Sequence, residues 1–468
     1  MTKIIVIGGG IAGISAAVGA RKAGAEVTLL ERQDQLMGIG RIAGSMDVGG
    51  RYPLHLEIVE MGGPEVNAAL DSVSLDNMDK YRESHYPHHR MPGSLEDMTS
   101  HSWIYNVMTA DPVLRKMLQD MGIEILWRSR VVDVEKECNR ITKVKYFKDR
   151  YEVNWIEADA FIDTTGSAGG MKECTKYVGG CAMCPWMQCP TFGDRINFAG
   201  KAGARTVNMH QKDGTPGIKY NGLYLYKESL SQEWKDKLAE THQIFVPFRG
   251  IVDWDLDPEW SWGTRGQDGN DGKGHPADKD TSWRVAPDVG RFRLLDRGIF
   301  AGGAGPSPLK LEQLREVPGF ENIVAAGPVG GMNLWSLGHD LVFCENNLRV
   351  PPLDNLFTAG SKAHMVDIQP GINSGYMAGF NAVRAAVGKP LEEFPMSTVS
   401  GDIIDFTRRF LADSAESEYG GPTTFVSAHA GHYLKHLKDE GFFPDNTEKC
   451  KQRVADAGFT DYFNKPVI

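Results

Sequence analysis

The sequence is poor in basic charge and in long apolar runs, and each shortage excludes a class of protein. Lys and Arg number 51 against 61 Asp and Glu, giving a net charge of −10. An acidic chain repels phosphate backbones, so nucleic acid is a disfavoured partner. No apolar run approaches the roughly 20 residues that span a bilayer, so we expect no membrane segment.

Cysteine is also scarce, and a cleavable leader is missing. A strand-like run begins at Lys3 without a basic leader before it, so we expect the protein in the cytoplasm. The chain has 7 cysteines among 468 residues. Thiols stay reduced in the cytoplasm, so clustered cysteines there are more often metal ligands or catalytic groups than disulfides. There are no repeats, and the apolar content of 41% is ordinary for a soluble protein of two or three domains.

A nucleotide-binding pattern fills residues 3–32. Residues 3–7 form the short apolar run of a buried parallel strand, and a Gly-x-Gly-x-x-Gly motif follows at once. Residues 14–23 are small and compatible with a helix, and 27–30 form a second apolar run that ends at Glu31. Strand, glycines, helix, strand and acid therefore come in the order of a dinucleotide site.

Each position in this motif has a mechanical reason. Gly8 allows the tight turn, and Gly10 lets a pyrophosphate approach the backbone at the helix N-terminus. Gly13 lets the helix pack close to the strand, and the Glu31 carboxylate can bind ribose hydroxyls.

Two later segments extend the nucleotide fold. Residues 122–147 read as several short strands, and 158–169 form an apolar strand that leads through Asp163 to Gly166. Residues 355–389 read as a strand, a glycine turn and a long helix. A nucleotide fold split across early, middle and late segments is typical of FAD enzymes.

The three segments resemble the glutathione-reductase-type FAD fold. They are most similar to the branch that includes the glucose-inhibited division protein A family and the folate- and FAD-dependent tRNA-uridine methyltransferases. The stretch LREVPGFENIVAAGP (314–328) is similar to the family's approach to its last FAD strand, and 356–391 follows the family's strand, loop and helix. The resemblance covers roughly residues 1–32, 120–166 and 312–410.

The resemblance implies an α/β fold with a discontinuous Rossmann-like FAD-binding domain. We predict this domain at 1–170 and 312–392. An inserted α+β domain for substrate and the cysteine cluster is predicted at 171–311, and a helical region at 393–468 is a candidate homodimer contact.

The late glycine turn has a predicted role toward the flavin. Pro370-Gly371 is expected to precede a helix that starts near Ile372, whose free N–H groups would face the pyrimidine edge. The predicted FAD-binding residues are Gly8, Gly10, Gly13, Glu31, Arg32, Arg41, Val132, Gly166, Gly360, Gly371, Ile372 and Asn373.

Four of the cysteines lie close together, at Cys174, Cys181, Cys184 and Cys189. Four thiolates suit a [4Fe–4S] cluster, although the spacing is not a standard ferredoxin run. A zinc site, a redox dithiol and simple packing are the alternatives. We name all four as candidate metal ligands, and Cys184 and Cys189 also as candidate catalytic thiols.

The sequence predicts an FAD-dependent oxidoreductase that exchanges a hydride or electrons with a small-molecule substrate, with a possible relay to an iron–sulfur centre and a protein partner. His339 is a candidate acid or base beside the flavin. One alternative is a folate-linked transferase acting on RNA, but residues 222–240 lack the cysteine that the methyltransferases carry in an Asn-Cys-Pro stretch. Another is a non-catalytic, FAD-bearing subunit of an electron-transfer complex.

Overall fold

The computed structural model describes residues 1–38, 53–73, 107–149, 152–166, 198–207, 220–225, 227–241, 243–247, 291–295, 299–304, 315–329, 341–366, 368–415, 426–427, 433, 436–437, 439–442 and 447–468.

A five-stranded parallel sheet forms the centre of the fold, in the order β15-β7-β1-β2-β3. Its members are β1 (Lys3–Ile7), β2 (Glu26–Leu30), β3 (Glu124–Leu126), β7 (Ala160–Asp163) and β15 (Leu356–Thr358). The late strand β15 therefore pairs with a middle strand, as the prediction of a split nucleotide fold requires. The predicted α/β fold class is confirmed.

The carboxyl ends of three neighbouring strands lie level with one another. Ile7 at the end of β1 pairs with Asp163, and Asp163 pairs with Thr358. The chain leaves β1 toward β2 on one side, whereas β7 lies on the other side. Open α/β sheets bind ligands outside the carboxyl ends of the strands at such a reversal of strand order.

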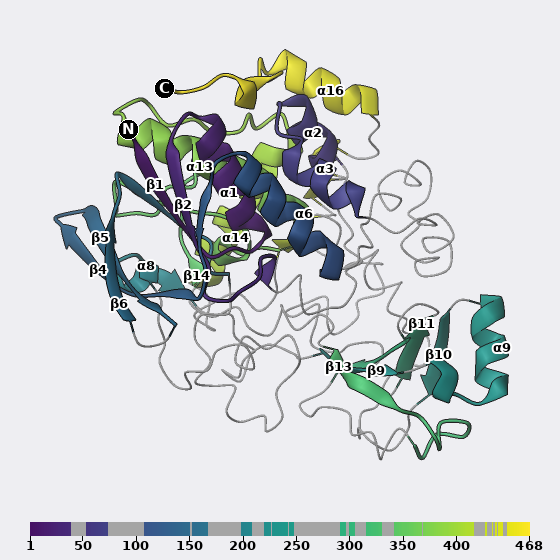
Figure 1. The fold of residues 1–468 in the computed structure, drawn as a ribbon. Coiled ribbons are helices and arrows are strands. Elements are labelled where there is room, and N and C mark those ends of the chain that lie inside the picture. The colour runs from purple at the N-terminus through teal and green to yellow at the C-terminus, as the bar shows by residue number, and fades with distance from the viewer. Residues whose placement is uncertain are drawn as a thin grey trace.

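Helices cover one face of the sheet, where alternate residues such as Ile4 and Val6 join the main core. Helix α1 (Ile11–Lys22) packs along α13 (Ile368–Ala386), as Figure 1 shows. The two backbones approach so closely that a Cβ on Gly379 would lie 2.3 Å from the Ala16 carbonyl oxygen. The other helices in this layer are α2 (Leu54–Glu60), α3 (Glu65–Ser72) and α6 (Val107–Asp120).

A second, antiparallel sheet covers the opposite face. Ile5, Ile7 and Phe161 point to this side and share a core with Val131 and Val144 of the antiparallel sheet. Its strands are β4 (Ser129–Glu137), β5 (Arg140–Lys148) and β6 (Glu152–Glu157), and the short helix α8 (Phe198–Lys201) contacts β4. The predicted strands within 122–147 are thus confirmed.

The region predicted as an insert contains both strands and helix. Strand β9 pairs with β12 and β13, while β10 pairs with β11. The bounds are β8 (Thr206–Val207), β9 (Tyr220–Leu225), η3 (Lys227–Ser229), α9 (Gln232–Thr241), β10 (Gln243–Pro247), β11 (Arg291–Leu295), β12 (Ile299–Ala304) and β13 (Ala325–Val329). Because β13 pairs with β9, this sheet extends beyond the predicted boundary at 311.

The last part of the chain returns to the central sheet. Its elements are β14 (Leu341–Val342), η5 (Gly360–Ala363), β16 (Met365–Val366), α14 (Val399–Ala415), β17 (Val426–Ser427), α16 (Thr447–Asp456) and η6 (Tyr462–Asn464). The backbone N–H of Val467 bonds to the carbonyl of Ala23, which ties the C-terminus to the end of α1. Among the described helices, none combines the length and apolarity needed to cross a bilayer.

Candidate dinucleotide-binding site

Two glycines of the first turn are required by the protein's own packing. Gly8 has φ +105°, and a Cβ there would lie 2.7 Å from the carbonyl oxygen of Thr164. A Cβ on Gly13 would lie 1.8 Å from the carbonyl oxygen of Gly8. Larger residues at either position would push α1 away from the end of β1. These two glycines therefore bring helix, strand and the β7 turn together.

Gly10 is different, because the described fold does not require a glycine there. It precedes α1 with φ −69° and ψ 174°, a conformation open to any residue. No described atom lies within 4 Å of the position that a Cβ would take. Among the described residues, no side chain caps the N-terminus of α1. Within the described residues, the backbone at the head of α1 is therefore uncovered, and a pyrophosphate requires such a backbone.

Glu31 lies where the second strand ends, as predicted, and is 5% exposed. Its Oε2 accepts a hydrogen bond from the N–H of Gly9 at 2.6 Å, and its Oε1 accepts one from Gln33 at 2.8 Å. The carboxylate is therefore held beside the glycine turn. Of the other predicted contacts near this end, Arg32 is exposed and Val132 is buried in β4.

Gly166 lies just after β7, at the same edge of the sheet. It has φ +75°, and no described atom lies within 4 Å of its Cβ position. Before it, the Thr164 hydroxyl donates to the carbonyl oxygens of Ile7 and Gly8. The β7 turn and the β1 turn are thus bonded to each other, and Gly166 follows directly after them at the same edge of the sheet.

The late glycine turn is not a turn before the helix, and this part of the prediction was wrong. Helix α13 begins at Ile368, so Pro370, Gly371 and Ile372 lie inside it. Proline is tolerated in a first turn because the N–H that it lacks would have no partner there. The predicted N-terminus therefore exists, but it starts four residues earlier than expected.

The first turn of α13 lies against the first turn of α1. A Cβ on Gly371 would be 3.7 Å from the Cβ of Ala12, and the N–H of Gly360 donates to the Ser374 hydroxyl at 3.0 Å. Two helix N-termini, each with a partial positive charge, thus meet at one edge of the sheet. This arrangement suits a ligand that carries negative charge along its length.

The Asn373 side chain is bound within the protein. Its Nδ2 donates to the Leu54 carbonyl at 3.0 Å and to the Ser400 hydroxyl at 2.9 Å. Ser400 in turn donates to the buried carboxylate of Glu57 at 2.7 Å. Burial raises the pKa of Glu57, although the Arg453 guanidinium beside it acts in the opposite direction. These contacts hold α13 against α2 and α14.

Sequence reasoning missed a buried pair at the same edge. Asp163 ends β7, Lys362 lies in η5 just after β15, and both side chains are 0% exposed. Nζ of Lys362 lies 3.9 Å from Oδ2 of Asp163. A lysine in a loop normally reads as a surface residue. The signal that could have found it is the position of both residues just at or after the ends of two neighbouring strands.

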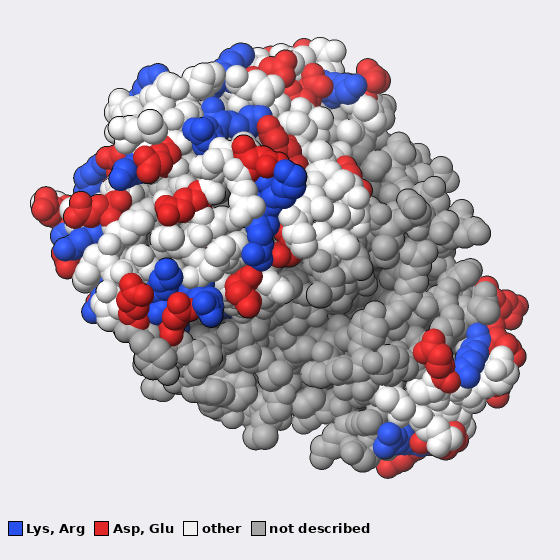
Figure 2. All heavy atoms as spheres, viewed as in Figure 1, with Lys and Arg blue, Asp and Glu red and all other residues white. Residues whose placement is uncertain are grey.

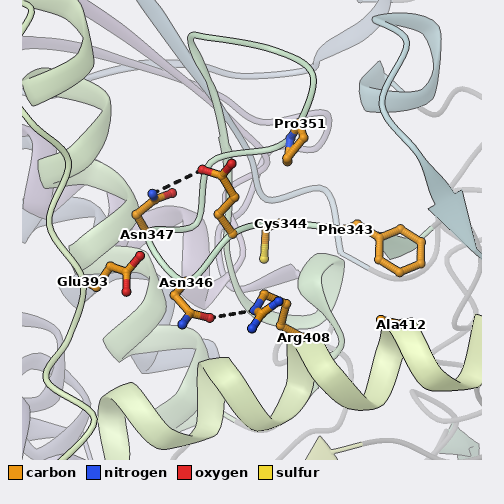
Figure 3. A pocket seen from close by; sticks show the side chains of 9 residues that line it. Phe343, Cys344, Asn346, Asn347, Pro351, Glu393, Arg408 and Ala412 are labelled. Atoms are coloured by element: carbon orange, nitrogen blue, oxygen red, sulfur yellow. Dashed lines mark hydrogen bonds between the residues drawn. The ribbon is translucent and has the colours of Figure 1, made fainter.

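A separate hollow of about 440 Å³ lies between α14 and the segment after β14 (Figure 3). Cys344 lines it together with Asn346 and Arg408, whose Nε donates to the Asn346 side chain at 2.8 Å. Burial raises the pKa of the Cys344 thiol to about 12. The thiol is therefore protonated near neutral pH and is no nucleophile.

Several predicted residues lie outside the described residues. They are Arg41, His339, Cys174, Cys181, Cys184 and Cys189. Within the part of the chain that the structure describes, no group of three or more His, Cys, Asp or Glu side chains could hold a metal ion.

Comparisons with known proteins agree with this geometry. Residues 3–171 match the sequence model of a family described as FAD dependent oxidoreductase. The fold is similar to that of GidA from Aquifex aeolicus in its form I crystal, with a TM-score of 0.58, 14% identity, and coverage of 98% of this chain and 76% of that chain. The form II crystal gives a TM-score of 0.55, 15% identity, and coverage of 97% and 76%. No curated protein matches the sequence.

At such low identity the likeness concerns the fold. The chain has the fold of FAD-dependent oxidoreductases, including that of the GidA branch, as the sequence resemblance led us to expect.

Proposed function

We propose that the chain is an FAD-dependent oxidoreductase that exchanges a hydride or electrons with a small-molecule substrate. The observation that carries this proposal is the backbone at Gly10, which no described atom covers, at the head of α1 and the carboxyl end of β1. The match of residues 3–171 to the FAD dependent oxidoreductase family supports it. FAD, when bound, supplies the redox chemistry, and the protein supplies orientation and electrostatics.

The described residues divide the binding of FAD between them. The N–H groups at the start of α1 would bind the pyrophosphate beside Gly10, and Glu31 would accept hydrogen bonds from the ribose. The first turn of α13 would place its partial positive charge near the flavin end, where it favours a reduced, negatively charged ring. Together these groups fit a dinucleotide that runs along the carboxyl edge of the sheet.

A small-molecule substrate suits the described surface better than RNA does. On the face drawn in Figure 2, basic and acidic side chains lie interspersed over the described elements. Many are paired, as Arg115 is with Asp111 and Lys116 with Asp120. Interspersed charges do not create the positive field that attracts a phosphate backbone.

The cysteine cluster at 174–189 adds a second, finer proposal. The four thiols lie just after residue 171, where the family match ends, so the match does not assign them a role. We infer that they bind a [4Fe–4S] cluster that relays single electrons between the flavin and a protein partner. A Cys181/Cys184 dithiol is the alternative.

One purification tests both proposals. The full chain is purified without oxygen, and its spectrum, flavin content, iron and acid-labile sulfide are measured. Flavin bands that bleach with dithionite, or binding of added FAD to a chain purified without it, are expected. A chain that neither retains FAD nor binds it in titration would overturn the oxidoreductase proposal. Flavin without iron would overturn only the cluster.

A further inference from the structure

The buried pair of Lys362 and Asp163 lies at the carboxyl edge of the parallel sheet. Asp163 is the last residue of β7, and Lys362 lies in η5, four residues after the end of the neighbouring strand β15. Thr358 of β15 donates its hydroxyl to the Asp163 carbonyl oxygen at 3.0 Å, which fixes the two strand ends together. The pair therefore lies at the carboxyl ends of β7 and β15, next to the end of β1.

The two charges are poorly satisfied. Oδ1 of Asp163 accepts hydrogen bonds from the N–H and the hydroxyl of Thr165, at 3.1 and 2.7 Å. Oδ2 of Asp163 and Nζ of Lys362 are buried and have no hydrogen-bond partner among the described residues. Their separation of 3.9 Å is too long for a direct hydrogen bond. A buried ion pair without good hydrogen bonds costs more in desolvation than it returns in attraction.

We expect a third group to lie between the two side chains and to satisfy both of them. The hydrogen-bonding chemistry of that group follows from theirs. An ammonium group only donates hydrogen bonds, and a carboxylate only accepts them. A group that bonds to both must accept and donate at once, as a hydroxyl does. A hydroxyl oxygen about 2.8 Å from each atom would span the gap with an angle of about 90° at the oxygen.

We propose that Lys362 and Asp163 together bind a hydroxyl of the FAD ribityl chain, with Lys362 as donor and Asp163 as acceptor. The ribityl chain joins the pyrophosphate to the flavin ring, so its hydroxyls pass along the same edge of the sheet as the open backbone at Gly10. This inference rests on the proposed FAD function. A buried water is the other source of a hydroxyl at this place.

Because the pair is buried, a ligand can reach it only if a neighbouring side chain moves, and Thr165 is the candidate. This residue is exposed and contacts Asp163, whereas Asp163 and Lys362 are fully buried. Binding therefore requires the Thr165 side chain to turn aside. At Gly166, which follows it, no described atom lies within 4 Å of the Cβ position.

The test combines two substitutions that remove both charges and preserve shape, Lys362→Met and Asp163→Asn. The full-length chain is stripped of nucleotide, and its affinities for FAD and for ADP are measured by calorimetric titration. ADP carries the adenosine and pyrophosphate but no ribityl chain. We expect the double variant to bind FAD about 10- to 100-fold more weakly, and ADP as tightly as wild type. Its thermal midpoint without nucleotide should equal or exceed that of wild type.

A matched control removes an ion pair at the far end of α1. Lys22 is bonded to Glu65 there, so Lys22→Met with Glu65→Gln should leave FAD affinity unchanged. The inference is overturned if the Lys362/Asp163 variant binds FAD like wild type, which would leave only a water at the site. It is also overturned if ADP affinity falls equally, or if the midpoint without nucleotide drops. Failure of the wild type itself to bind FAD would instead refute the proposed function.

Discussion

Adding one methyl group at Gly10 should weaken FAD binding and leave the stability of the fold almost unchanged. The backbone at Gly10 has φ −69° and ψ 174°, which alanine adopts without strain, and no described atom lies within 4 Å of the new Cβ. Replacing glycine by alanine gains about 0.4–1 kcal/mol through the unfolded chain. Alanine is a poorer helix N-cap than glycine by a similar amount. For Gly10→Ala we therefore expect the free energy of unfolding without ligand to change by less than about 1 kcal/mol.

FAD binding should respond quite differently to the same methyl group. The Cβ would enter the space that the pyrophosphate needs next to the N–H groups of α1. A hydrogen bond to a charged group contributes about 1.5–3 kcal/mol. Since about 1.4 kcal/mol corresponds to a factor of ten in affinity, the loss of one such bond should weaken FAD binding about 10- to 150-fold.

Quenching of FAD fluorescence during titration measures the affinity, and urea unfolding measures the stability. Gly13→Ala is the matched control, because its Cβ would lie 1.8 Å from the Gly8 carbonyl oxygen and should disrupt folding itself. A Gly10→Ala protein that binds FAD as tightly as wild type would refute the placement of the pyrophosphate. One that fails to fold would refute the claim that the fold does not need this glycine.

Three further predictions concern the core and the thiols. Burial raises the pKa of Glu57 above 4.5, so its protonation favours the folded state and that contribution is lost as pH rises through the raised pKa. As the pH rises from 4.5 to 7, the unfolding free energy of wild type should therefore fall relative to that of Glu57→Gln. A difference between the urea midpoints of the two proteins that stays constant over this range would contradict the prediction. Gly379→Ala would place a Cβ 2.3 Å from the Ala16 carbonyl oxygen, so we expect a loss of about 3 kcal/mol in urea unfolding, and a loss below about 1 kcal/mol would disprove the close helix contact. With a pKa of about 12, only about one Cys344 thiol in ten thousand is ionised at pH 8. Iodoacetamide should therefore label exposed Cys138 well before half-buried Cys344 in peptide mass spectra, and equal labelling rates would contradict the raised pKa.

The parts of the fold that sequence could predict are those where local pattern and local structure agree. The apolar run at 3–7 is a strand with the predicted bounds, and the acid after the second strand lies beside the glycine turn. Short buried strands, a glycine turn and a small-residue helix are all determined over a few residues. The resemblance then placed β15 in the same sheet, which pattern alone could not have done.

Features that depend on contacts between residues far apart in the chain could not be predicted from the sequence. The boundary at 311 does not account for β13, which pairs with a strand about a hundred residues earlier. The start of α13 was misplaced because Pro370 reads as a helix breaker, although the first turn of a helix tolerates proline. In both cases the prediction used a local rule, whereas a long-range strand pairing determines the extent of the sheet and a helix-end effect determines the start of the helix.

Two independent features point to a ligand at the same edge of the sheet. Within one glycine motif, Gly8 and Gly13 are required by contacts under 3 Å inside the protein, whereas Gly10 borders space that the described fold leaves open. Lys362 and Asp163 are buried charges that the fold does not satisfy. Unmet hydrogen bonds of buried charges lower stability, and natural sequences keep such features mainly at functional sites. An uncovered backbone and an unsatisfied buried pair thus occur at neighbouring strand ends, and together they argue for a bound dinucleotide more strongly than the glycine spacing by itself.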